Sequence, residues 1–366
     1  MATLEERIKN IEEEIRNTSY NKKSQHHIGK LKAKLAQLRE ELIVKRSSGG
    51  RGGGFAIRKF GDATVGLVGF PSVGKSTLLN KLTDAKSRVG EYEFTTIQVI
   101  PGMMKYKGAN IQIIDLPGLI EGASIGRGRG REILSMIRNM DLILIMIDVL
   151  KIKELEAIER ELYNIGIRLD QRPPQITIKK KATGGIHIIS SAKLRRIDER
   201  MIKDILTEYK IHSADVTIQE DISEDQLIDA IIGNRIYIPS IVVLNKIDFV
   251  DEDELKRISR ELDREYIAIS ANNGVNLDEL KEEIFKRLDI IRVYMKPPGK
   301  EADMNEPLIM KRGSTIEDIC NRLHKGFREK FKVAKIWGKS ARFDGQPVGL
   351  SHVVNDRDIV TIITAK

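Results

Sequence analysis

A glycine-rich segment near residue 70 carries the residue types that bind phosphate. It fits the pattern G-x-x-x-x-G-K-[ST], follows an apolar run and precedes a leucine-rich helical pattern. The backbone N–H groups of such a loop can bind phosphates, while its lysine reaches the β and γ oxygens and its serine binds Mg²⁺. A strand–helix turn without a ligand would use similar residues. The predicted phosphate-binding residues are Gly69, Phe70, Pro71, Ser72, Val73, Gly74, Lys75, Ser76 and Thr77.

A second segment, Asp115-Leu-Pro-Gly118, stands at the end of the next apolar run. Ligands of α/β folds bind at the carboxyl ends of the strands, so this segment and the phosphate-binding loop should meet. We expect Asp115 to hold Mg²⁺, through a water molecule, and the N–H of Gly118 to meet the γ-phosphate. Taken alone, such a tetrapeptide is also a common turn.

Two further segments follow later apolar runs and suit the recognition of a guanine base. The carboxylate of Asp248 offers two acceptors that match the N1–H and N2–H₂ donors of guanine, Asn245 can meet N7, and the stem of Lys246 can cover the ring. In Ser270-Ala271-Asn272, a backbone N–H can donate to O6. Because all of these segments occur in one order, each at a strand end, we predict a guanine-nucleotide-binding P-loop protein.

Thr95 and Thr96 lie between the first two segments. A threonine here can contact Mg²⁺ and the γ-phosphate only when GTP is bound, so the segment would order with GTP and loosen with GDP. We favour Thr96, and the alternative is that both threonines merely begin a strand. The predicted metal ligands are thus Ser76, Thr96 and Asp115, and the predicted catalytic residues are Lys75, Thr96 and Gly118.

Leu119 occupies the position where many GTPases carry a glutamine that orients water. A leucine side chain cannot do this. Either hydrolysis is slow, or a main-chain group, a monovalent cation or a partner replaces the glutamine. A purely packing role for Leu119 is the alternative.

Short strand patterns alternate with helical ones from residue 63 onward, which predicts an α/β fold with a mostly parallel sheet covered on both faces. The expected strands are Thr64–Phe70, Ile111–Asp115, Leu142–Asp148, Ile241–Asn245 and Tyr266–Ser270. The nucleotide-binding domain is assigned to residues 62–168 and 239–290, with an inserted α+β subdomain at 169–238.

Other segments flank this centre. Residues 1–48 show two amphipathic helical patterns, opened by the capping pair Thr3 and Glu6, and predict a helical hairpin. Residues 49–61 form a Gly/Arg linker, and 291–366 form a small α/β module.

Composition limits the classes of protein that remain. Of 366 residues, 41% are hydrophobic and 31% charged, which suits a large core and argues against global disorder. A single cysteine excludes a disulfide framework. No apolar run is long enough to span a membrane and no secretory leader is visible, so we expect a cytoplasmic protein without a membrane partner.

The net charge of +9 is unevenly distributed. Residues 1–60 carry +7 and residues 290–366 carry +6, whereas the centre carries −4. A polyanionic partner held by the two ends would explain this division, and so would an ordinary solvated surface.

These motifs together resemble the developmentally regulated GTP-binding (DRG) family of Obg-related GTPases. The resemblance rests on residues 69–77, 92–96, 115–123 and 128–131 and extends through 210–217 and 234–239. It implies an insert similar to a domain of a small-subunit ribosomal protein and a C-terminal TGS domain of β-grasp fold. It also implies association with the ribosome or other RNA and, as a further possibility, an accessory regulatory protein.

The resemblance also bears on cofactors. Mg²⁺ is expected with GTP or GDP, and K⁺ is a further candidate because potassium stimulation is known among relatives. Relatives with the clearest potassium site carry Asn where this chain has Ser72. Our hypothesis is a ribosome- or RNA-associated GTPase switch that is slow without a partner or a monovalent cation. The alternative is an RNA- or protein-binding adaptor in which the nucleotide is mainly structural.

Overall fold

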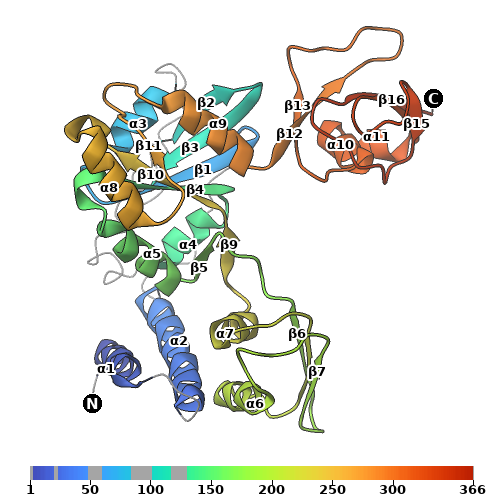
Figure 1. Ribbon diagram of the computed structural model, residues 1–366. Coiled ribbons are helices and arrows are strands. Elements are labelled where there is room, and N and C mark those ends of the chain that lie inside the picture. Colours follow the sequence, from blue (N-terminus) through green and yellow to red (C-terminus); the bar gives the residue numbers. More distant parts are fainter. Residues whose placement is uncertain (1–2, 20–23, 48–59, 84–100, 117–129, 366) are drawn as a thin grey trace. The chain divides into compact units, whose positions relative to one another are not determined.

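The structure is a computed structural model that describes residues 3–19, 24–47, 60–83, 101–116 and 130–365. Its contacts divide the chain into two compact units, whose elements are labelled in Figure 1. The first unit comprises Met1–Ala56, Gly118–Arg138 and Leu155–Ile238, and the second comprises Ile57–Pro117, Asn139–Glu154 and Pro239–Lys366. Each unit is described by itself below.

A six-stranded sheet forms the centre of the second unit, in the order β11-β10-β4-β1-β3-β2. All neighbouring strands are parallel except β2, which runs antiparallel to β3. Its strands are β1 (Ala63–Val68), β2 (Pro101–Tyr106), β3 (Ala109–Asp115), β4 (Leu142–Asp148), β10 (Ser240–Asn245) and β11 (Ile267–Ala268). Its helices are α3 (Lys75–Leu82), α8 (Glu252–Leu262) and α9 (Leu277–Arg287), with short 3-10 turns η2 (Val149–Lys151) and η3 (Ile247–Phe249).

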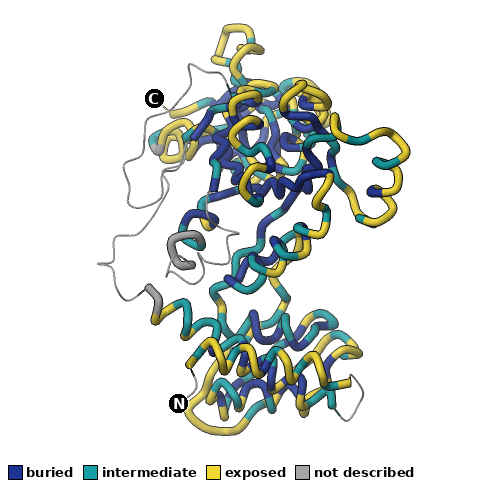
Figure 2. Tube along the Cα trace, turned by 90° about the vertical axis from the view of Figure 1, so that its left-hand side faces the viewer, coloured by how far each residue is buried: buried dark blue, intermediate teal, exposed yellow. Residues whose placement is uncertain are grey.

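The central strands are buried along their whole length, and Figure 2 draws the buried residues of the chain in dark blue. Every residue of β1, β4 and β10 is buried, because helices cover both faces of a parallel sheet and leave no polar side. This explains why their sequences are continuous apolar runs. The rigid sheet thereby fixes the positions of the loops that leave its carboxyl edge.

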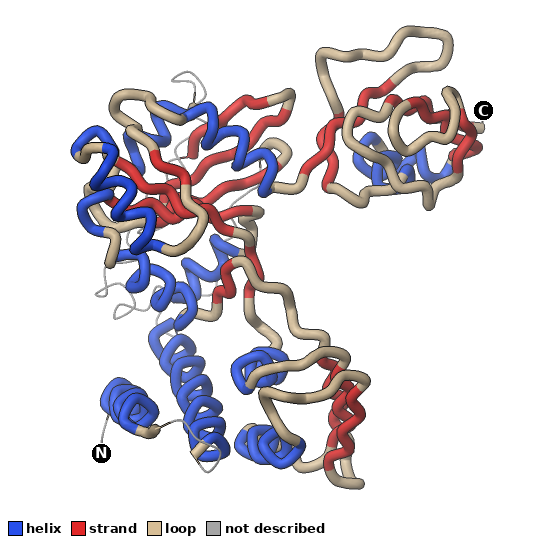
Figure 3. The backbone as a smooth tube through the Cα atoms, viewed as in Figure 1, coloured by secondary structure: helices blue, strands red, loops and turns tan. Residues whose placement is uncertain are grey.

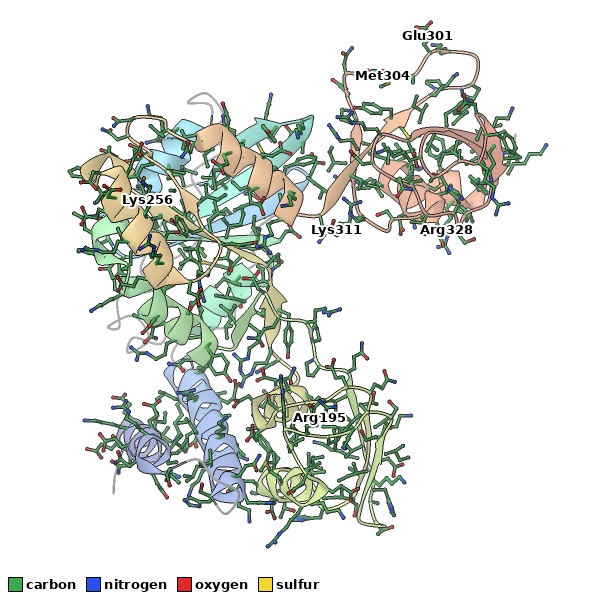
Figure 4. All side chains as sticks on the ribbon, in the orientation of Figure 1. Arg195, Lys256, Glu301, Met304, Lys311 and Arg328 are labelled. Atoms are coloured by element: carbon green, nitrogen blue, oxygen red, sulfur yellow. The ribbon has the colours of Figure 1, made fainter. Side chains whose placement is uncertain are left out.

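A second sheet in this unit has the order β13-β12-β16-β14-β15 and packs on helix α10. Its elements are β12 (Ile290–Met295), β13 (Leu308–Lys311), α10 (Ile316–Leu323), α11 (Lys325–Glu329), β14 (Phe331–Trp337), β15 (Gln346–Val348) and β16 (Ile359–Thr364). The half-buried Asp356, which forms an ion pair with Arg292, and the buried core around Ile336 and Val360 belong to it. Figure 4 labels Glu301 and Met304 on the long connection from β12 to β13.

The first unit begins with two helices, α1 (Leu4–Asn17) and α2 (Gln25–Ser47). Thr3 caps α1 in a reciprocal capping box with Glu6, as the sequence predicts. Ile11 of α1 is buried against Leu31, Leu35 and Leu38 of α2, so the apolar stripes of the two helices meet. The expected N-terminal helical pair is therefore present.

The rest of the first unit contains α4 (Gly130–Ile137), α5 (Glu154–Asn164), a two-stranded parallel pair and a three-stranded sheet. The pair is β5 (Ile167–Leu169) with β9 (Ile236–Ile238). The sheet has the order β6-β8-β7 and consists of β6 (Ile176–Lys180), β7 (Ile186–Ser190) and β8 (Ala214–Ile218). Its helices are α6 (Glu199–Glu208) and α7 (Glu224–Ile232). They share one apolar core with α2 and one face of the sheet.

Most expected strands match observed ones to within a few residues, and the α/β fold class is confirmed. The strand expected at Tyr266–Ser270 is shorter, covering only Ile267–Ala268. Strands β2 and β12 were not among the expected strands. In β2, which lies at the sheet edge, buried and exposed residues alternate less regularly. The domain boundaries drawn from the sequence stay a prediction. No described helix is long and apolar enough to cross a membrane.

Candidate functional site

The glycine-rich loop connects β1 to α3, and two of its glycines are required by close approaches. A Cβ on Gly69 would lie 2.5 Å from the carbonyl oxygen of Met146. Gly74 has φ +98°, and a Cβ there would lie 2.4 Å from Nδ2 of Asn245. Only glycine combines this backbone conformation with such contacts. The loop is therefore packed against the ends of the neighbouring strands, with its backbone turned around the start of α3.

Lys75 begins α3 and its ammonium group lies over the loop. Nζ donates hydrogen bonds to the carbonyl oxygens of Gly69 at 2.8 Å and Phe70 at 2.9 Å. A cation held at this place is well situated to meet phosphate oxygens that approach the helix N-terminus. A bound phosphate would compete with these two carbonyls for the same ammonium group.

Ser76 and Asp115 come from different elements and meet beside the loop. The hydroxyl of Ser76 lies 3.5 Å from Oδ2 of Asp115, the last residue of β3. Burial raises the pKa of Asp115, although the charge of Lys75 and the contact with Ser76 act in the opposite direction. Within the described part of the chain, Oδ1 of Asp115 is buried without a hydrogen-bond partner. A hydroxyl beside a partly unsatisfied carboxylate fits a hydrated Mg²⁺ ion, which prefers oxygen ligands.

Asn245, the last residue of β10, links the phosphate loop to the predicted base-binding segments. Its Nδ2 donates to the carbonyl oxygen of Val73 at 2.7 Å, and its Oδ1 accepts from the N–H of Ala271 at 2.9 Å. The side chain is almost completely buried, so both the nitrogen and the oxygen of its amide need these partners. In this structure Asn245 therefore holds two loops together, in addition to the base contact predicted from the sequence.

Lys246 follows in a left-handed conformation with φ 68° and forms an ion pair that the sequence interpretation missed. Its Nζ lies 2.7 Å from Oδ2 of Asp148, the last residue of β4. Burial alone would raise the pKa of Asp148, but the hydrogen bonds from Lys246 and from the N–H of Leu150 lower it below its ordinary value. The sequence did contain a signal for this pair: Asp148 is an acidic residue at the end of an otherwise apolar strand, at the same sheet edge as Asn245.

The remaining base-binding candidates lie next to these residues. Asp248, in η3, is exposed to solvent. Ser270 is fully buried and its hydroxyl accepts from the N–H of Asn273 at 3.2 Å, while Asn272 is exposed. These contacts shape a tight turn after β11 and present its backbone near Asn245.

The structure thus brings residues 69–77, Asp115, 245–248 and 270–272 to the carboxyl edge of one sheet. Thr95 and Thr96 fall in 84–100, and Gly118 and Leu119 fall in 117–129, so these four residues lie outside the described part. Their roles stay predictions.

A mostly parallel sheet that carries a phosphate-binding loop and these segments at its carboxyl edge defines a P-loop GTP-binding protein. Family models match it along most of its length. Residues 64–181 match the model described as a 50S ribosome-binding GTPase, 183–290 match the C-terminal region of that domain, and 291–364 match the TGS domain. The chain belongs to the family of developmentally regulated GTP-binding proteins.

Relatives match over almost the whole chain. An uncharacterised GTP-binding protein of Methanocaldococcus jannaschii is 55% identical over 98% of this chain and 93% of its own. Developmentally regulated GTP-binding protein 1 of Xenopus laevis is 46% identical over 98% of each chain. Among solved structures, the YchF GTPase of Schizosaccharomyces pombe is 17% identical, covering 84% of this chain and 99% of its own, with a TM-score of 0.47.

Proposed function

We propose that the protein hydrolyses GTP to GDP and phosphate and that the bound nucleotide controls its association with the ribosome or another RNA assembly in the cytoplasm. The observation that carries this proposal is the gathering of the phosphate loop, Asp115, Asn245 and Ala271 at one sheet edge. Membership of a GTP-binding family agrees with it.

In the proposed site, Lys75 moves from the carbonyls of Gly69 and Phe70 to the phosphate oxygens. Ser76 and Asp115 hold Mg²⁺, which neutralises charge on the phosphates when bound. Thr96 and the N–H of Gly118 complete the contacts to the γ-phosphate. Asn245, Lys246 and Asp248 hold the base, with Ala271 and its neighbours at O6.

Leu119 leaves the attacking water without a glutamine. We therefore expect slow hydrolysis by the isolated protein, accelerated by a partner, by an accessory protein or by a monovalent cation such as K⁺. Relatives with the clearest potassium site carry Asn at the position of Ser72, so a comparison of K⁺ with Na⁺ decides whether this chain uses the cation.

The distribution of charge supports an RNA partner. The N-terminal helices with the linker and the C-terminal module carry the positive charge, while the nucleotide-binding centre is slightly negative. Lysine and arginine on appendages can neutralise RNA phosphates without disturbing the nucleotide site. In this proposal the appendages contact RNA and the nucleotide state sets how they engage it.

Sedimentation with ribosomes in GTP, GDP and a non-hydrolysable GTP analogue tests the switch. We expect more protein in the pellet with GTP or the analogue than with GDP. The variant Lys335→Glu with Lys339→Glu should reduce pelleting, because both exposed lysines belong to the C-terminal module. Deleting residues 291–366 is a poor substitute, since Ile309 packs in the core of the nucleotide-binding sheet.

The matched control is Lys256→Glu with Arg260→Glu on α8, which changes the charge equally at exposed sites of the nucleotide-binding part. Figure 4 labels Lys256 on this helix. Equal pelleting of all proteins in every nucleotide state would remove the switch from the proposal.

The second candidate function is an RNA- or protein-binding adaptor whose nucleotide is mainly structural. The presence of Leu119 in place of a catalytic glutamine favours it. Single-turnover hydrolysis, measured with and without ribosomes and with K⁺ or Na⁺, separates the two functions. Negligible hydrolysis in every condition supports the adaptor, and acceleration by ribosomes or K⁺ supports the enzyme.

A further inference from the structure

One stretch of the first unit is strongly basic and contains no acidic residue. Residues 171–197 include 7 lysines and arginines and no aspartate or glutamate, whereas residues 198–238 include 4 basic and 10 acidic residues. All 7 basic side chains are exposed. They are Arg172, Lys179, Lys180, Lys181, Lys193, Arg195 and Arg196. The separation of charge divides this part of the molecule into a cationic and an anionic region.

The three-stranded sheet places six of these residues, all except Arg172, in two groups. β6 runs antiparallel to β8 and β7 runs parallel to it, so Lys180 pairs with Ala214 at one end of β8 and Ser190 with Ile218 at the other. Lys179–Lys181 therefore lie at one end of the sheet, and Lys193, Arg195 and Arg196 follow β7 at the opposite end. Four residue steps at about 3.3 Å separate the two ends, or roughly 13 Å along the strands.

The outer face of this sheet is uncovered in the described unit. Helices α6 and α7 pack on the inner face through Ile178, Ile188 and Val216, and Figure 3 shows both helices on one side of the strands. The burial of β6 and β7 alternates, which places Thr177, Lys179, His187 and Ile189 outward, and Ile189 is 63% exposed.

The backbone holds the second basic group in place, and its side chains are exposed to solvent. Oδ1 of Asp221 accepts hydrogen bonds from the N–H groups of Arg195 at 2.8 Å and Arg196 at 3.3 Å. These bonds occupy the carboxylate with backbone donors, which lowers the pKa of Asp221. At the other end of the sheet, Lys181 pairs with Asp215. Among the described residues, none of the other basic side chains of this stretch pairs with a carboxylate.

We propose that the outer face of β6, β8 and β7, with the basic groups 179–181 and 193–196 at its two ends, binds double-stranded RNA. The two cationic ends would contact the two phosphate backbones that border a groove. Between them, the hydroxyls of Thr177 and Thr217 would meet 2′-hydroxyl groups. This surface adds an RNA contact in the middle of the sequence to those proposed for the two basic ends of the chain. The choice of RNA as its ligand rests on the proposed function.

The composition of the face selects a duplex over a single strand. Proteins bind single strands by stacking bases on aromatic side chains, whereas they recognise RNA duplexes by shape and by phosphate and 2′-hydroxyl contacts. Residues 171–197 contain no phenylalanine, tyrosine or tryptophan. A sheet with small hydroxyl side chains at its centre and cations at its ends suits the backbone of a duplex.

The test uses the full-length protein and an RNA duplex of about 16 base pairs, a length that one duplex-binding domain spans. We compare the wild type with the variant Lys179→Glu, Lys180→Glu, Arg195→Glu, Arg196→Glu by fluorescence anisotropy at several salt concentrations. The variant should bind at least about 10-fold more weakly, and its dependence on salt should fall because released counterions are fewer. GDP affinity should stay unchanged, which shows that the protein is folded.

The matched controls keep the number of reversed charges but move them. Arg200→Glu with Lys203→Glu reverses two charges at exposed residues of α6, on the side of the sheet that the helices cover. It is compared with two double variants, Lys179→Glu with Lys180→Glu and Arg195→Glu with Arg196→Glu. The control should bind the duplex within about twofold of the wild type.

Three results would overturn the proposal: no loss in the fourfold variant, an equal loss in the α6 control, or equal binding of a single-stranded RNA of the same length. Because this measurement needs no GTP, its failure leaves the nucleotide switch standing. Failure of the sedimentation test would likewise leave duplex binding standing.

Discussion

The ammonium nitrogen of Lys246 lies 2.7 Å from Oδ2 of Asp148; Asp148 ends β4, and Lys246 directly follows the last residue of the adjacent parallel strand β10. Only 7% of Asp148 is exposed, so its carboxylate has little contact with water and its charge is balanced by Lys246. The contact fixes the stem of the lysine that the base-recognition assignment places against guanine. We therefore expect Asp148 to act as a positioning residue, through Lys246.

Replacing Asp148 with Asn should weaken nucleotide binding. The amide can still accept from the N–H of Leu150, whose bond to Oδ1 measures 3.0 Å, but it loses the charge that holds Lys246. We expect the Kd for a fluorescent GDP to rise about 10-fold, or about 1.4 kcal/mol. Stopped-flow measurement of GDP release checks the same effect as a faster dissociation rate.

Asp253→Asn is the control for this variant. It removes the exposed pair with Lys256, whose atoms lie 3.1 Å apart on α8, and should leave GDP affinity unchanged. A drop in stability of Asp148→Asn without a change in GDP affinity would show that the pair is structural only.

Asp248→Asn tests base recognition directly. An amide donor opposite position 2 of the base should favour xanthine, which carries an acceptor there, over guanine. We expect GTP affinity to fall and xanthosine triphosphate affinity to rise, as measured by competition against a fluorescent nucleotide. Unchanged GTP affinity would remove Asp248 from the base site.

The raised pKa of Asp115 predicts how stability without nucleotide, and the effect of Mg²⁺ on GDP release, depend on pH. Its pKa is raised by burial, so the carboxyl takes up a proton at higher pH than an ordinary aspartate. The nucleotide-free protein should therefore gain stability as pH falls through that raised pKa, because the neutral form suits the buried site. Conversely, Mg²⁺ needs the carboxylate, so its effect on GDP release should weaken over the same range.

We would measure thermal unfolding without nucleotide and GDP release with and without Mg²⁺, from neutral pH down toward the ordinary aspartate pKa of about 4. Asp115→Asn should flatten both pH profiles and reduce the effect of Mg²⁺ throughout. If this variant and the wild type respond alike to Mg²⁺, Asp115 does not hold the metal.

A buried ion network in the first unit predicts a large loss of stability when its central carboxylate, Asp229, is replaced. Asp229 accepts from Arg168 at 2.6 and 2.7 Å and from Arg235 at 2.9 Å, and Arg235 also contacts Glu40 of α2 at 2.6 Å. Asp229→Asn leaves the buried guanidinium group of Arg168 without a carboxylate and removes one of the two carboxylates that Arg235 contacts. Breaking such a buried pair costs about 3 to 5 kcal/mol.

Hydrogen exchange is the suitable measurement, because the chain has more than one unit and its unfolding is not expected to be two-state. Amides of α7 and α2 should exchange at least about 100-fold faster in Asp229→Asn. Asp215→Asn, which removes the exposed pair with Lys181, should change exchange only slightly. Similar exchange in both variants would contradict a stabilising role for the network.

Local sequence predicted much of the phosphate loop and the sheet. Gly74 and Lys75 are recognisable because a tight turn and a helix start impose residue types at fixed spacing, and the apolar strands are recognisable because both faces of the sheet are buried. Asn245 was assigned to the base from its motif, yet nothing in the sequence revealed its bonds to Val73 and Ala271.

What the sequence by itself determined is the class of nucleotide and the order of the binding segments, because backbone geometry and base chemistry demand those residues locally. Only the tertiary structure decided that Asp148 pairs with Lys246 and that Arg168, Asp229 and Arg235 share one buried network. It also brought Lys179 and Arg195 to opposite ends of one uncovered sheet. Such contacts join residues far apart in the chain, and their strength depends on burial and distance, which arise only when the strands and helices pack.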